Sequence, residues 1–290
     1  MLGIMGHKFG PPDIGSLIPK RLIEEAGGLK NFRTCECGDG LKVHRRVDDE
    51  RVRRPVNGRR GFETVRFTST KNSARDIHCE SKGEFPLFCV LEIDASIEFY
   101  RDQLDVVEIH DELGETWACP DAFALLRRTQ EPIWIEGKYA TRLLHGPNNL
   151  KKLEQGISPK LEGKLARLRR AFMKAGLSYV ALNQSFCRSK TVADNVNRAF
   201  WQRGKIPASE EIAHLTELLA SGPLPFRDCI AAFSDRAFPA DWLFAAIARG
   251  HAEYDLRNPF SLESKVELPT GRPFWIEAPA FEDDVEYAGC

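Results

Sequence analysis

The chain has 290 residues, of which 42% are hydrophobic and 29% charged, with a formal net charge of −1. This composition predicts a soluble globular protein, long enough for a sizeable core and two domains. No apolar run approaches the length of a membrane span, and the N-terminus lacks the apolar core of a signal peptide. We therefore expect a cytoplasmic protein with no membrane partner.

The small net charge conceals a strong segregation of charge along the chain. Residues 42–75 carry eleven Lys and Arg against four acids, and residues 76–121 carry thirteen acids against two bases. Residues 148–205 return to thirteen bases against three acids. An acidic block between two basic ones suits a metal-binding active site between surfaces that bind a polyanion. The alternative is a solvated charged surface without a ligand.

The eight cysteines do not indicate a metal site. The only close pair is Cys35-Glu36-Cys37, and no second pair follows at zinc spacing. His44 and the dipeptide His78-Cys79 could complete a site, but no zinc template fits. We expect free thiols, as is usual in a reducing cytosol.

Residues 1–60 are predicted to be an N-terminal extension. They begin with Gly/Pro-rich sequence, include a helix candidate at 16–26 and end in an arginine-rich arm, and parts of them are expected to order only on a partner.

Residues 61–205 are predicted to form one α/β domain around a mixed sheet. A helix of about ten residues begins near Glu84, where Ser81 and Glu84 form a capping-box pattern. A basic amphipathic helix is expected at 159–175. The strand candidates are 65–69, 77–79, 97–100, 106–109, 116–119, 133–135 and 177–182.

Asp121, Glu136 and Lys138 are the most informative residues. Asp121 precedes an apolar run and a polar turn, after which a short strand carries Glu136 and Lys138 on one face. A hairpin can hold these three side chains around one point. Carboxylates are hard ligands for Mg²⁺ or Mn²⁺, and a nearby lysine can orient water and stabilise charge on a phosphate. The alternative is an ordinary surface salt bridge.

Residues 206–268 change in character. We expect three short helices followed by a small β-wing, which together indicate a winged-helix-like module that binds DNA or a partner; a plain helical appendage is the alternative. The expected helices are 209–220, 226–233 and 240–249, and the wing strands lie within 251–256 and 264–268. Residues 269–290 are predicted to be an acidic tail.

The chain resembles a known family over roughly residues 62–200. Segment 66–84, segment 91–103 (with Leu91-Glu92, Asp94, Tyr100 and Gln103) and segment 172–182 are similar to TnsA-type endonucleases. These are the nuclease subunits of heteromeric cut-and-paste transposases and have a restriction-endonuclease-like fold. Two departures are Leu104, where the family usually has proline, and Gly137, where it usually has a hydrophobic residue.

The resemblance implies a complete active site. Its catalytic residues would be Glu84, Asp121, Glu136 and Lys138, with Glu80 as the fallback for Glu84. Mg²⁺, for which Mn²⁺ substitutes, would be held by Glu84, Asp121, Glu136 and the carbonyl of Gly137. Glu136 is the least secure ligand, since the family does not require an acid there.

The implied function is hydrolysis of one DNA strand, the 5′ strand, at transposon ends. The expected partners are double-stranded DNA, a DDE-type transposase subunit and an AAA+ ATPase regulator, on the nucleoid of a prokaryotic cell. The alternatives are a stand-alone restriction, defence or repair nuclease and a catalytically silent DNA-binding scaffold. The candidate phosphate contacts are Arg167, Arg169, Arg170, Lys174, Arg188 and Lys190.

Overall fold

The computed structural model describes residues 14–53, 65–73, 75–79, 84–138, 159–183, 187 and 189–275. The chain divides into two compact units. The N-terminal unit comprises Met1–Arg54 and Gln103–Pro120, and the main unit comprises Pro55–Asp102 and Asp121–Cys290. The presence of helices with several sheets confirms the expected α/β class.

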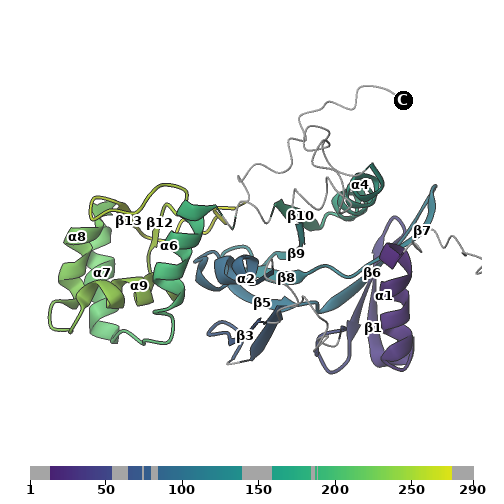
Figure 1. The fold of residues 1–290 in the computed structure, drawn as a ribbon, viewed down its shortest axis with the longest axis horizontal. Coiled ribbons are helices and arrows are strands. Elements are labelled where there is room, and N and C mark those ends of the chain that lie inside the picture. Colours follow the sequence, from purple (N-terminus) through teal and green to yellow (C-terminus); the bar gives the residue numbers. More distant parts are fainter. Residues whose placement is uncertain are drawn as a thin grey trace, which may run out of the picture. The chain divides into compact units, whose positions relative to one another are not determined.

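The N-terminal unit is a four-stranded antiparallel sheet with one α-helix packed against it (Figure 1). The strand order is β1-β2-β6-β7, and helix α1 contacts β6 and β7. Val106 and Trp117 of the sheet form a small core with Leu22 and Ile23 of the helix. The elements are α1 (Ile14–Glu25), the 3-10 helix η1 (Leu29–Asn31), β1 (Phe32–Gly38), β2 (Leu41–Arg46), β6 (Asp105–Asp111) and β7 (Gly114–Ala118).

The sequence predicted α1, β6 and β7 but missed β1 and β2. Along β1 only Phe32 is buried, and β2 carries Lys42, Arg45 and Arg46. The apolar alternation by which strands are recognised is absent from most of β1, and in β2 it extends only from Leu41 to Val43 before two arginines follow. Parts of this extension were expected to order only on a partner, but β1 pairs with β2, and β2 in turn pairs with β6.

The main unit is built on a four-stranded mixed sheet in the order β10-β9-β8-β5. Strands β9 and β10 are parallel, whereas β8 is antiparallel to both β5 and β9. The mixed sheet and the hairpin that delivers Glu136 are as predicted. The elements are β5 (Ile97–Asp102), β8 (Ala122–Leu126), β9 (Pro132–Lys138) and β10 (Ser178–Asn183).

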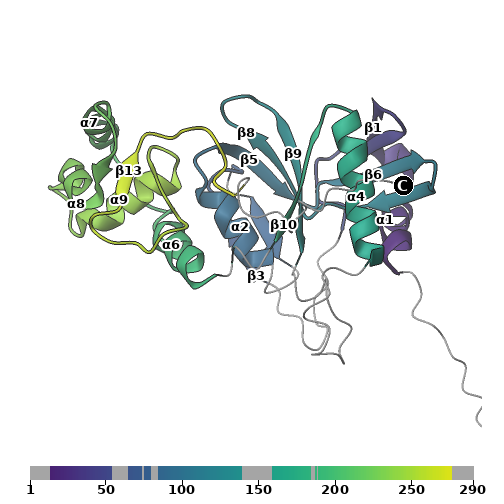
Figure 2. The ribbon, with the colours of Figure 1, turned by 90° about the horizontal axis from the view of Figure 1, so that it is seen from above.

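Two helices cover opposite faces of this sheet (Figure 2). Ala122 and Ile135 lie in the large core with Leu87 of α2 (Glu84–Ile93). Alternate residues point the other way, toward α4 (Pro159–Lys174). On that face a chain of ring contacts runs through Phe99, Phe123, Trp134, Phe172 and Tyr179.

A buried carboxylate joins α2 to its surroundings. Glu92 is fully buried and accepts hydrogen bonds from the Ser69 hydroxyl, from the Thr70 amide and hydroxyl, and from the Tyr100 hydroxyl, each at 2.7 Å. Ser69 and Thr70 follow β3 (Val65–Thr68), which pairs with β4 (Asp76–Cys79). One charge therefore ties this hairpin and β5 to α2.

Lys71 occupies the C-terminal end of the same helix. Its ammonium group donates to the carbonyl oxygen of Leu91 at 3.0 Å and to that of Asp94. A cation at this position is favoured by the helix dipole. Its removal from water lowers the pKa of Lys71 to about 8, although Asp94 and Glu92 oppose the shift.

The C-terminal part of the main unit contains the three predicted helical segments, of which the second (226–233) is divided into a short α-helix and a 3-10 helix, and both predicted wing strands. A short strand, β11, joins the other two in an antiparallel sheet of order β11-β13-β12. The elements are α6 (Lys190–Phe200), α7 (Ser209–Leu219), β11 (Leu224–Pro225), α8 (Phe226–Cys229), the 3-10 helix η3 (Ile230–Phe233), α9 (Pro239–Ala248), β12 (Glu253–Tyr254) and β13 (Lys265–Glu267).

Helix α9 is buried rather than exposed. It contacts α6, α2 and η3, and its Leu243 and Phe244 belong to the core that also contains Leu87. Buried Asn195 of α6 donates to the carbonyl oxygens of Leu256 and Asn258, at 2.9 and 2.7 Å. The domain boundary between residues 205 and 206 stays a prediction. One continuous hydrophobic core contains residues from both sides of it.

None of the helices in the described part of the chain is long and apolar enough to cross a membrane. In the described part of the chain, Cys35 and Cys37 are free thiols, as expected.

We expect Glu92→Gln to lower the free energy of unfolding by about 1–3 kcal/mol, because hydrogen bonds to a buried charge lose strength when the acceptor is neutral. The matched control is Glu98→Gln on exposed β5 surface, which should change stability by no more than about 0.5 kcal/mol. Urea unfolding of both variants tests this. Equal effects would mean that the Glu92 network does not stabilise the fold.

Candidate functional site

The structure brings Asp121 and Glu136 together. Asp121 immediately precedes β8, where Ala122 pairs with Ile135 of β9. One step further along this antiparallel register, Asp121 lies opposite Glu136. The Gly137 amide donates a hydrogen bond to Oδ2 of Asp121 at 2.8 Å.

The pair sits on the face of the sheet that α4 covers. Glu136 is two residues from Trp134, so both side chains lie on one face of β9. The Trp134 ring contacts Phe172 of α4, with 5.1 Å between ring centroids. The aromatic packing under α4 thus orients the strand that carries Glu136.

Tyr179 of β10 belongs to the same site, and the sequence did not indicate it. Its side chain is 7% exposed, and its hydroxyl has no hydrogen-bond partner among the described residues. Burial, followed by the negative charges of Glu136 and Asp121, raises the pKa of Tyr179 well above its ordinary value. Tyr179 could have been found from its strand, because β10 lies beside β9 and Tyr179 pairs with Trp134, two residues before Glu136.

The other predicted active-site residues are placed less completely. The backbone of Lys138 pairs with Asn183 at the end of β9, and its side chain lies outside the described residues. Glu84 is half-buried at the first position of α2, a helix that contacts β4 and β5. Glu80 lies outside the described residues. Of the predicted ligands, Asp121 and Gly137 are joined by a hydrogen bond.

Most of the predicted DNA-binding residues lie on α4. Its inner side is formed by buried residues such as Leu168 and Phe172, while Arg169, Arg170 and Lys174 are exposed on the outer side. Arg167 is half-buried on the same helix. Lys190 is exposed at the start of α6, and Arg188 lies outside the described residues.

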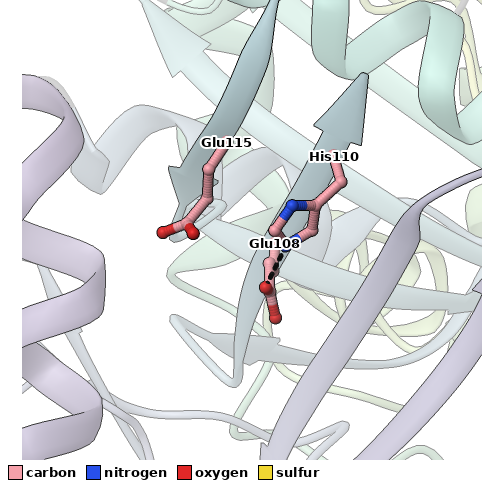
Figure 3. Close-up of side chains that lie close together, drawn as sticks. All are labelled: Glu108, His110 and Glu115. Atoms are coloured by element: carbon pink, nitrogen blue, oxygen red, sulfur yellow. Dashed lines mark hydrogen bonds and ion pairs between the residues drawn. The ribbon is translucent and has the colours of Figure 1, made fainter. Parts of the chain in front are cut away.

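A second group of potential ligands lies in the N-terminal unit (Figure 3). Glu108 and His110 of β6 and Glu115 of β7 each offer a ligand atom, and these atoms lie within 4.8 Å of one another. Sequence reasoning missed this group. Its signal is a Glu-x-His pair on a strand, followed by a glutamate on the next strand.

Comparisons with known proteins leave the family open: no protein-family model matches the chain, and no curated protein sequence is similar to it.

We expect Tyr179→Phe to leave the free energy of unfolding unchanged or to raise it by up to about 1 kcal/mol, because it removes a buried hydroxyl that lacks a partner among the described residues. Tyr254→Phe is the matched control. Its hydroxyl donates to the Asn195 carbonyl at 2.8 Å, and its removal should lower stability by about 1 kcal/mol. Urea unfolding compares the two. A comparable drop in stability for both variants would show that Tyr179 is hydrogen-bonded in the native state.

Proposed function

We propose that this chain is a metal-dependent endodeoxyribonuclease with Asp121, Glu136 and Lys138 at its active site. The observation that carries the proposal is the opposition of Asp121 and Glu136 across two antiparallel strands, with Lys138 two residues further along the same strand. A restriction-endonuclease-like core is supported by a mixed sheet with a helix on each face.

The arrangement of Gly137 supports a cation site beside Asp121. In an antiparallel pair, the N–H and C=O of one residue point toward the same neighbouring strand. Because the Gly137 amide donates to Asp121, the Gly137 carbonyl also points toward the Asp121 side of β9. Mg²⁺ or Mn²⁺ would then be held by Asp121, Glu136 and the Gly137 carbonyl, with Glu84 as the further ligand.

The chemistry would be hydrolysis of a phosphodiester. The cation would activate water and neutralise charge that develops on the phosphate. Lys138 would act as a compact charge that orients the water or contacts the phosphate. Tyr179 would keep one side of the carboxylates away from solvent.

The basic outer face of α4 supports DNA as the substrate. This helix packs over the sheet face that carries Glu136, so DNA bound by Arg169, Arg170 and Lys174 would lie on the same side of the sheet as the acidic pair. Phosphate contacts give affinity and position without reading sequence.

The wider role as the nuclease subunit of a cut-and-paste transposase rests on the resemblance to TnsA-type endonucleases. Cleavage of the 5′ strand, a DDE-type transposase partner and an AAA+ regulator are proposed on that ground. The order helix, strand, helix, 3-10 helix, helix, strand, strand after residue 206 supports a winged-helix-like module. Because α9 is buried, we assign this module to docking on a partner or on DNA backbone rather than to base reading.

The catalytic proposal predicts that Asp121→Asn and Lys138→Met each lower Mg²⁺-dependent cleavage by roughly 100- to 1000-fold, the usual effect of removing a group that stabilises transition-state charge. DNA affinity should stay within a few-fold. Glu131→Gln, in the exposed turn before β9, is the control and should cut normally. The measurement is strand-specific cleavage of labelled duplex DNA by the full chain, with and without a transposase partner.

The same assay separates the alternatives. Cleavage only at transposon ends, and only with a DDE-type transposase, supports the transposition role. Efficient cleavage by the chain alone supports a stand-alone nuclease. DNA binding with no cleavage under either condition, in Mg²⁺ or in Mn²⁺, would leave a silent scaffold and would reject the catalytic proposal.

The DNA-binding proposal predicts a change in salt dependence. Replacing Arg169, Arg170 and Lys174 with Gln should reduce the slope of log affinity against log salt by about one for each phosphate that is no longer bound, without changing sequence preference. The control double variant replaces the exposed Arg21 and Arg33 of the N-terminal unit and should leave the slope unchanged. An unchanged slope in the triple variant would show that this face of α4 does not contact DNA.

A further inference from the structure

The group Glu108, His110 and Glu115 has the arrangement of a metal site distinct from the proposed nuclease centre. Glu108 and His110 are two residues apart on β6 and share one face of the sheet. Glu115 lies directly opposite His110 on β7. Three ligand atoms within 4.8 Å therefore come from two paired strands, whose backbones hold them more firmly than a loop would (Figure 3).

One ligand of the group is already oriented by a buried neighbour. Glu108 is 9% exposed, and its Oε2 is 2.9 Å from Nε2 of His44, which is 1% exposed. The other ring nitrogen of His44 lies 2.9 Å from the Thr34 hydroxyl, so both nitrogens are engaged. A carboxylate ligand held by a hydrogen bond from the surrounding shell is typical of protein metal sites.

The remaining two ligands leave a path for an ion to enter. The side chains of His110 and Glu115 are 47% and 39% exposed, and in this structure Nε2 of His110 contacts Oε1 of Glu108. Glu115 also pairs with Lys20 at 3.1 Å. That pair is exposed and contributes at most about 1 kcal/mol. Nε1 of Trp117 donates a hydrogen bond to the same oxygen, Oε1, so coordination would use Oε2 of Glu115.

The ligand set selects the kind of metal. One imidazole nitrogen with two carboxylates is softer than the all-oxygen environment that Mg²⁺ and Ca²⁺ prefer. It fits zinc, whose catalytic-type sites use three protein ligands and an open position. Cys35 and Cys37 do not belong to the set: Cys35 pairs with Val43, which lies on the face of β2 opposite to His44.

We propose that Glu108, His110 and Glu115 bind one divalent transition-metal ion, Zn²⁺ being the best fit, with His44 positioning Glu108. The ion joins β6 to β7 in the N-terminal unit. This site is independent of the proposed nuclease activity.

Zn²⁺ binding to the metal-stripped full chain tests the proposal, measured by competition with a chromophoric chelator and by the absorption of bound Co²⁺. We expect one ion per chain in the wild type. His110→Asn and Glu115→Gln change exposed side chains, so both variants should fold, and each should weaken Zn²⁺ binding by at least about tenfold because each removes a direct ligand. Bound Zn²⁺ should also raise the thermal unfolding temperature of the wild type but not of these variants.

Two control variants locate the ion. The double variant Cys35→Ser/Cys37→Ser and the variant Asp121→Asn should both retain wild-type affinity for Zn²⁺. Loss of binding in the first would assign the ion to the thiols, and loss in the second would assign it to the nuclease centre. Either of these losses would overturn the proposal. So would unchanged Zn²⁺ binding in both His110→Asn and Glu115→Gln, or a wild-type chain that does not bind Zn²⁺.

Discussion

The burial of Glu92 is the constraint on which the main unit depends. A carboxylate removed from water is tolerated only when its oxygens are fully hydrogen-bonded, and here the donors come from Ser69, Thr70 and Tyr100. These donors belong to the β3–β4 hairpin and to β5, so satisfying one charge determines how both meet α2. Lys71 acts on the same helix by binding carbonyls at its C-terminal end. Glu92 thus has a structural role in the main unit.

The positions of Asp121 and Glu136 follow from the packing of α2 on the sheet. The core on the α2 side holds Ala122 and Ile135, and their alternation turns Asp121 and Glu136 toward α4. The aromatic contacts on that side, from Phe99 to Tyr179, keep the strands in register under the helix. A slip of one residue would send both carboxylates into the apolar core, which makes the register strongly specified. The meeting of Asp121 and Glu136, on which the proposed function rests, is therefore a consequence of how the sheet is packed.

Much of the secondary structure could be predicted from local sequence patterns. Strong apolar periodicity predicted α4, β10 and the three helices after residue 206, and the short turn between Leu126 and Pro132 predicted the β8–β9 hairpin. The strands β1 and β2 were not predicted, because charged side chains interrupt the alternation of apolar and polar residues along them. Strand β1 pairs with β2, and β2 pairs with β6, more than fifty residues away in the sequence, so no local window contains that partner.

Local sequence was sufficient for most element types, for the charge segregation and for the spacing that places Glu136 and Lys138 on one face of a strand. The meeting of residues from separate segments depended on tertiary structure. It placed Asp121 against the Gly137 amide, brought Tyr179 beside the two carboxylates, buried α9 in the main core and gathered Glu108, His110 and Glu115 at one corner of a different sheet. The physical reason is that periodicity reports burial within an element, whereas register and packing between elements depend on long-range pairing and on the satisfaction of buried polar groups.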